Sequence, residues 1–175
     1  MDGEQISDPR AYEPLTPEHL AKLAAVARAD RAALFGRCEH LARYQDRILP
    51  VALCQGGAQH YAGADGSNGI KDLDVWTLYA ADEGAAYPAR RVGKITDCDM
   101  PGLTTWTRRI DFLGRSIPVP LGIGPAEAWH IYLTTKRTGT VVALRKKPVV
   151  LLELSAQLGM VVWMPDKSRI IAAPR

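Results

Sequence analysis

Residues 72–80 combine two acids with a run of strand-forming side chains, and this combination narrows the possible folds more than any other segment. Asp72 and Asp74 flank Leu73, and Val, Trp, Thr and Tyr follow them. Side chains alternate along a strand, so both carboxylates would share one face while Leu73 and Val75 enter the core. By the same alternation, Lys71 is expected to point away from the acids. The segment predicts a sheet with a polar site on one face.

The rest of the chain predicts helices before, between and after several short strands. Thr16-Pro17-Glu18 is typical of a helix start. Helices are expected over 16–27, 35–48 (ended by Pro50) and 125–137 (ended by Gly139), strands over 51–54, 72–80, 104–113, 148–152 and 161–163, and either over 140–147. This order favours an α/β (α+β) fold with a small mixed β-sheet flanked by helices. We expect a single domain over residues 16–175 and a flexible N-terminal arm over 1–15.

Length and composition are those of a globular domain. The chain has 175 residues, of which 47% are hydrophobic and 23% charged. Spanning a bilayer takes about 20 consecutive apolar residues; the sequence has no such run, so no membrane association is expected. The polar N-terminus lacks the features of a secretory signal. Cys38, Cys54 and Cys98 are widely spaced, which predicts reduced thiols and a cytoplasmic location.

Two further elements suit a phosphorylated ligand bound with a divalent metal. Gly56-Gly57 follows the expected strand 51–54, and a glycine turn brings backbone N–H groups close to a phosphate. Asp111 lies between Ile110 and Phe112 on another expected strand, so it is a candidate third carboxylate beside Asp72 and Asp74. The alternative is an ion pair between Asp111 and Arg109 on the same face of that strand.

The ordered set Leu53-Cys54-Gln55-Gly56-Gly57, Asp72-Leu73-Asp74-Val75 and Ile110-Asp111-Phe112 resembles the nucleotidyltransferase superfamily that includes DNA polymerase β, in particular its minimal bacterial members. The resemblance covers roughly residues 48–115 and extends more weakly through 125–137. It implies a nucleotidyltransferase-like fold, Mg²⁺ (or Mn²⁺), and transfer of an NMP group from an NTP to a hydroxyl of a protein, an RNA or a small molecule. It assigns catalytic and metal-binding roles to Asp72, Asp74 and Asp111, and triphosphate contacts to Gly56 and Gly57.

The sequence also departs from the family pattern. Gly57 replaces a common serine, 14 residues separate Gly57 from Asp72, and little chain remains for a helical acceptor-binding domain. These departures favour an alternative function, a catalytically weak or inactive NTP-binding or regulatory module. Such a module would have a protein partner, for example within a toxin–antitoxin pair.

Several other polar residues are weaker candidates. Lys136 and Arg137 are positioned to reach triphosphate oxygens or, alternatively, to cap the end of their helix. His60 would contact a ligand or, alternatively, be exposed to solvent or cap a helix. The basic run 145–147 would contact a nucleic-acid backbone or form a solvated turn, and Asp97 with Asp99 is a competing acidic pair.

Overall fold

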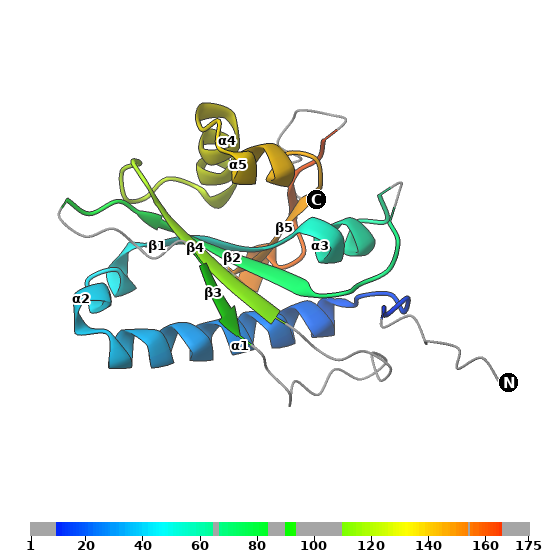
Figure 1. The fold of residues 1–175 in the computed structure, drawn as a ribbon, viewed down its shortest axis with the longest axis horizontal. Helices are drawn as coiled ribbons and strands as arrows, with labels where there is room; N and C mark the ends of the chain where they lie inside the picture. The colour runs from blue at the N-terminus through cyan, green and yellow to red at the C-terminus, as the bar shows by residue number, and fades with distance from the viewer. Residues whose placement is uncertain (1–9, 65–66, 84–89, 94–109, 154, 166–175) are drawn as a thin grey trace, which may run out of the picture.

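A computed structural model describes residues 10–64, 67–83, 90–93, 110–153 and 155–165, and Figure 1 shows their arrangement. The α-helices are α1 (Pro17–Arg37), α2 (Glu39–Ala42), α3 (Gln55–Tyr61), α4 (Pro125–Thr135) and α5 (Gly139–Leu144), and the short 3₁₀ helices are η1 (Gln45–Arg47) and η2 (Ser155–Gln157). The strands are β1 (Ile48–Cys54), β2 (Leu73–Ala80), β3 (Arg90–Gly93), β4 (Ile110–Ile117), β5 (Val149–Glu153) and β6 (Val161–Trp163).

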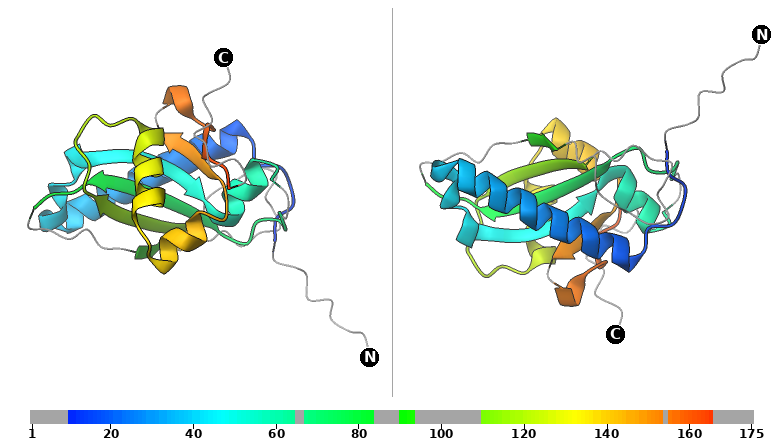
Figure 2. Two further views of the ribbon diagram at one scale, coloured as in Figure 1. Left: turned by 90° about the horizontal axis from the view of Figure 1, so that it is seen from above. Right: turned by 90° about the horizontal axis from the view of Figure 1, so that it is seen from below.

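These strands form one mixed sheet in the order β3-β4-β2-β1-β5-β6. The pairing of β2 with β4 is parallel, and the other pairings are antiparallel. Helix α1 runs along one face of the sheet, while α4 and α5 lie over the other (Figures 1 and 2). The predicted α/β fold with a mixed sheet flanked by helices is therefore confirmed. Within the described residues, none of the helices has the length and apolar character that crossing a membrane requires.

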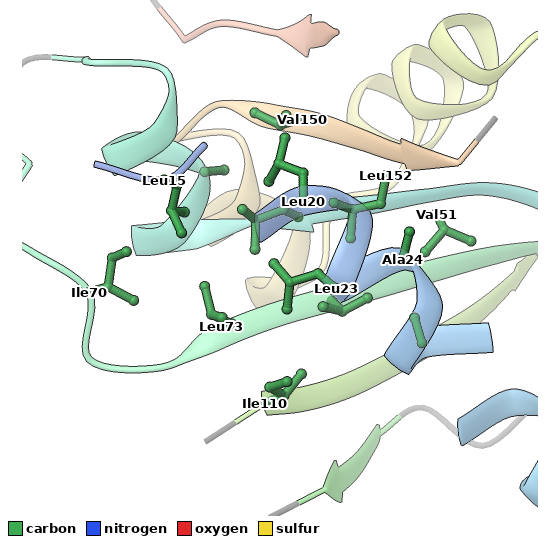
Figure 3. Packing of buried hydrophobic residues seen from close by; sticks show 14 of the residues in the cluster. Leu15, Leu20, Leu23, Ala24, Val51, Ile70, Leu73, Ile110, Val150 and Leu152 are labelled. Carbon is green, nitrogen blue, oxygen red and sulfur yellow. The ribbon is translucent and has the colours of Figure 1, made fainter. Parts of the chain in front are cut away.

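The sheet separates two hydrophobic layers. On one face, Leu20 and Leu23 of α1 pack against alternate strand residues such as Val51 and Leu73 (Figure 3). On the other face, the remaining strand residues pack under α4 and α5, where Trp129 is fully buried. Since successive residues of a strand face opposite sides, the strands β1, β2, β4, β5 and β6 contribute to both layers. The parity of a residue therefore decides which layer it enters.

The start of α1 agrees with its sequence signal. The Thr16 hydroxyl accepts a hydrogen bond from the backbone N–H of His19, and the His19 ring bonds back to the N–H of Thr16 at 3.0 Å. This reciprocal arrangement is a capping box in which histidine takes the place usually held by Glu or Gln. The segment before the helix is part of the fold, because Ala11 and Leu15 are buried in the core. The predicted arm thus covers too many residues at its C-terminal end, and residues 1–9 lie outside the described part.

The predicted helix over 35–48 is not continuous: residues 35–37 end α1, Glu39–Ala42 form α2 and Gln45–Arg47 form the 3₁₀ helix η1. Helix α1 ends at Arg37, and β1 already begins at Ile48, so Pro50 lies within a strand instead of ending a helix. Proline donates no hydrogen bond, and strands tolerate it at edges or irregularities. Accordingly, the register of β1 against β2 shifts between Ile48 and Val51.

Two further boundaries differ from the prediction. Helix α4 ends at Thr135, and Gly139 begins α5 instead of stopping the earlier helix; the Thr138 hydroxyl caps α5 by accepting from the N–H of Val141 at 3.3 Å. Strand β4 runs to Ile117, past the predicted end at residue 113. Residues 104–109 of the predicted strand lie outside the described part of the chain.

Candidate functional site

Two acids from distant parts of the sequence lie side by side on the sheet. Asp74 of β2 is directly opposite Asp111 of the parallel strand β4. The residues on either side of each acid, such as Val75 and Phe112, enter the layer beneath α1. Both carboxylates therefore point to the face that carries α4 and α5. Asp111 is buried, with 2% of its surface exposed, whereas Asp74 is half-buried.

Asp72 is placed differently from the prediction. Strand β2 begins at Leu73, so Asp72 stands just before the strand and its orientation is set by the preceding loop. It still lies on the same cleft as Asp74. Lys71, which strand alternation would point away from the acids, also lines that cleft. Strand alternation does not extend to residues that precede the strand.

The cleft has a volume of about 590 Å³ and lies on the α4/α5 face of the sheet. Its floor comes from β2 and β4, and its walls come from α3, from the segments beside Ala11 and β2, and from α5 with the turn after it. The described lining residues are Arg10, Gln55, Gly56, Gln59, Asn68, Gly69, Lys71, Asp72, Asp74, Trp76, Leu113, Arg115, Thr140, Ala143 and Lys147.

Charge in this cleft is mixed but predominantly positive. Four cations, Arg10, Lys71, Arg115 and Lys147, surround the carboxylates of Asp72 and Asp74. Such a combination attracts an anionic ligand while leaving acidic oxygens for a cation. Asp111 is not among the described lining residues, but it is the neighbour of Asp74 on β4 and faces the same side of the sheet.

The two glycines of the expected turn belong to the first turn of α3 and have different surroundings. Gly56 lines the cleft, and a Cβ at this position would meet no described heavy atom within 4 Å. Gly57 is buried, and a Cβ there would lie 2.9 Å from Cδ2 of Leu73. Backbone N–H groups in the first turn of a helix have no intrahelical acceptor. Gly56 is therefore the glycine whose surroundings suit a ligand, whereas Gly57 permits close packing of α3 on β2.

Gln55 stands at the junction of β1 and α3 with a backbone φ of 57°. This left-handed conformation is uncommon for a residue other than glycine, and such residues cluster at functional sites. The Gln55 side chain lines the cleft. Nothing in the local sequence indicates this conformation, because glutamine is not a residue type typical of it.

Lys136 and Arg137 do not take the position expected from the sequence. Both are exposed beyond the end of α4, and neither appears among the described residues that line the cleft. Lys147, the last residue of the basic run 145–147, lines it instead. The indole Nε1 of Trp163 donates to the carbonyl of Arg145 at 3.1 Å, which fixes the turn that carries Lys147.

Arg115 lines the cleft but is not among the candidate residues identified from the sequence. It lies four residues after Asp111 on β4, so strand alternation places both side chains on one face, and this spacing in the sequence indicates it. Arg115 forms a hydrogen bond with the phenol of Tyr132 on α4. Burial raises the pKa of Tyr132, and the hydrogen bond and positive charge of Arg115 partly oppose that shift. The phenol of Tyr132 on α4 therefore helps to hold the guanidinium of Arg115 in place.

Cys54 lies in register with Asp74 on β1, the other neighbour of β2. Burial raises the pKa of its thiol well above the usual range, and the negative charge of Asp74 raises it further. A thiol that stays protonated is a poor nucleophile and a poor metal ligand. Cys54 therefore belongs to the packing beneath the cleft.

His60 holds two segments next to the cleft. Its Nε2 lies 2.8 Å from the carbonyl oxygen of Glu13, and its Nδ1 lies 3.2 Å from the hydroxyl of Ser67. Since a carbonyl only accepts, Nε2 carries the proton and donates to it. These contacts give His60 a structural role, because they tie the segments that contain Glu13 and Ser67 to α3 beside the cleft.

The potential metal ligands that line the cleft are carboxylates. Among the described residues, no group of three or more His, Cys, Asp or Glu side chains is arranged to hold a metal ion. Two carboxylates, those of Asp72 and Asp74, do share the cleft. The competing pair Asp97 and Asp99 lies outside the described residues.

Comparison with known proteins does not identify the chain. No protein-family model matches it, and neither the curated proteins nor the solved structures include a significant match.

Proposed function

We propose that the chain is a metal-dependent nucleotidyltransferase that moves an NMP group from an NTP to a hydroxyl acceptor. The observation that carries this proposal is the register of Asp74 with Asp111 on neighbouring parallel strands. It joins two acids, 37 positions apart in the sequence, on the face that holds a cleft with Asp72 and four cations. The combination suits a polyphosphate that arrives with a divalent metal.

The donor set of the cleft fits Mg²⁺ or Mn²⁺. Mg²⁺ in proteins is commonly held by one or two carboxylates and by the phosphates of the substrate, with water completing the coordination. Asp72 and Asp74 would supply those carboxylates, and Asp111 would be the third acid beside them. When bound, the metal would supply Lewis-acid stabilisation of charge on the phosphate.

The protein residues then have separate roles. Arg115 and Lys147 would bind phosphate oxygens, the first as a planar fork and the second as a point charge. The backbone N–H of Gly56 would donate to phosphate from the first turn of α3. Asp111, which is buried beside Asp74, would accept the proton of the attacking hydroxyl.

A transfer assay tests this proposal. The protein is incubated with each of the four α-³²P-labelled NTPs and Mg²⁺ or Mn²⁺, together with protein, RNA and small-molecule acceptors. Transfer of label by the wild type and its loss in Asp74→Asn is the expected result. Asp46→Asn is the matched control, because Asp46 is an exposed acid in η1. Equal transfer by the wild type and Asp74→Asn would contradict the site.

A second candidate function is an NTP-binding or regulatory module without turnover. The observation that favours it is the absence, among the described residues, of a group of three potential ligands arranged to hold a metal. This module would bind nucleotide through the same cleft but transfer no label. Equilibrium binding of a non-hydrolysable NTP, combined with a negative transfer assay, separates the two functions.

A further inference from the structure

The segment that precedes α1 closes one side of the cleft. Arg10 lines the cleft together with Asn68, Gly69 and Lys71, which lie nearly 60 residues later in the sequence. The sequence predicts a flexible arm over residues 1–15, which include Arg10. The placement of Arg10 is therefore a tertiary feature that needs its own explanation.

Several contacts fix this segment in place. Ala11 and Ile70 exchange two backbone hydrogen bonds, of 2.9 Å and 2.7 Å, as an isolated antiparallel bridge. The Arg10 guanidinium donates to the carbonyl of Asn68 at 2.9 Å. His60 of α3 donates to the carbonyl of Glu13 at 2.8 Å. Hydrogen bonds at Ala11 and at Glu13 therefore hold the backbone segment from which Arg10 reaches the cleft.

Gly69 is an independent sign that the segment packs closely. Its φ is +70°, and a Cβ at this position would lie 3.0 Å from the carbonyl oxygen of Ala11 and 2.9 Å from Cε1 of Tyr12. Any other residue would be strained in its backbone and would push the segment away. The close contact between the two chain segments therefore depends on glycine.

We infer that Arg10 is a phosphate-binding residue of the cleft and that the segment around Ala11 serves to position it. The inference deepens the proposed function and rests on it for the identity of the ligand, a nucleoside triphosphate bound through its phosphate chain. A guanidinium binds phosphate through two parallel hydrogen bonds and keeps its charge at any physiological pH. Arg10 adds this chemistry to the cleft that Lys147 also lines.

Binding of sodium tripolyphosphate to the full chain, measured by calorimetry in metal-free buffer, tests the inference. We expect Arg10→Gln to weaken binding about tenfold, as for the loss of one charge-assisted hydrogen bond. Arg10→Lys should recover part of that loss, because it restores the charge. The matched control is Arg37→Gln, which removes an exposed cation at the far end of α1 and should bind as the wild type does.

Gly69→Ala tests the positioning role without changing any charge. It should weaken tripolyphosphate binding, and the double variant with Arg10→Gln should bind no more weakly than Arg10→Gln alone, because both changes remove the same interaction. Additive losses would overturn the positioning role. Unchanged binding in Arg10→Gln, or equal losses in Arg10→Gln and Arg10→Lys, would overturn the phosphate contact.

A measurement on the wild type covers the case in which a variant fails to fold. Tripolyphosphate should protect Arg10 from modification by phenylglyoxal, as mapped by mass spectrometry, and should leave Arg37 unprotected. Absence of protection at Arg10, including absence of any tripolyphosphate binding, would overturn the inference. These outcomes are separate from the transfer assay: Arg10-dependent binding without label transfer contradicts the nucleotidyltransferase alone, and transfer without Arg10 dependence contradicts the inference alone.

Discussion

Asp74 of β2 and Asp111 of β4 occupy directly opposed positions on two neighbouring parallel strands, so two carboxylates lie next to each other on one face of the sheet. Like charges in opposed positions destabilise a sheet. Arrangements of this kind are typical of sites where charge is needed for binding or catalysis. Cations, among them Arg115 and Lys147, line the adjacent cleft.

Magnesium should stabilise the wild type through these carboxylates. At a concentration ten times its Kd, a metal that binds only the folded state adds about 1.4 kcal/mol, which raises the thermal midpoint by about 3–5 °C for a chain of this size. Asp74→Asn should lose most of that shift, and Asp46→Asn should retain it. Scanning calorimetry with and without Mg²⁺ measures the difference. A magnesium shift of the same size in Asp74→Asn would argue against a metal at Asp74.

Gly57 and Gly56 should respond in opposite ways to alanine. At Gly57 the added methyl group would meet Leu73 at 2.9 Å and Leu53 at 3.1 Å, so overpacking should cost about 1–3 kcal/mol of unfolding free energy. At Gly56 the methyl group has open space, and loss of backbone entropy from the unfolded chain should leave stability unchanged or raise it by up to about 1 kcal/mol. Urea denaturation compares the two variants. Equal destabilisation by both would contradict the packing described for α3.

The ion pair between α1 and β5 provides a test of the fold away from the cleft. Arg31 is 7% exposed and contacts both carboxylate oxygens of Glu153, at 2.9 Å and 3.0 Å. Glu153→Gln leaves this buried guanidinium without a charged partner and should cost about 3 kcal/mol. Arg28 contacts the same carboxylate but is 59% exposed, so Arg28→Gln should cost no more than about 1 kcal/mol. Chemical denaturation of the two variants tests this ranking, and a larger loss in Arg28→Gln would contradict it.

Cys54 should make stability depend on alkaline pH. Burial and the charge of Asp74 raise the pKa of its thiol in the folded state, so the unfolded chain releases this proton first. The contribution of Cys54 to the unfolding free energy should therefore be constant below about pH 8 and should fall as pH rises beyond about 8.5. Cys54→Ala should be less stable overall, because it leaves a cavity, but its stability should fall less steeply. Urea denaturation between pH 7 and 9.5 gives both slopes, and identical slopes would contradict the raised pKa.

Local signals in the sequence predicted much of the fold. Thr16 and Pro17 mark the start of α1 because capping involves only neighbouring residues. The strand-forming run after Asp72 became β2 because its composition and alternation are also local. Signals that rest on one residue type were less reliable: Pro50 entered β1 and Gly139 began α5, since proline and glycine each suit several backbone positions.

The sequence by itself determined that Asp74 and Asp111 each lie on a strand between apolar neighbours, and therefore that each carboxylate needs a polar face. Only the tertiary structure decided that these two acids are adjacent, because adjacency depends on β2 and β4 pairing in parallel, in one register. It also brought Arg10 and Lys147 to the cleft and left Lys136 outside it. Strand order and helix packing bring together residues that are far apart in the chain, and local periodicity carries no information about that distance.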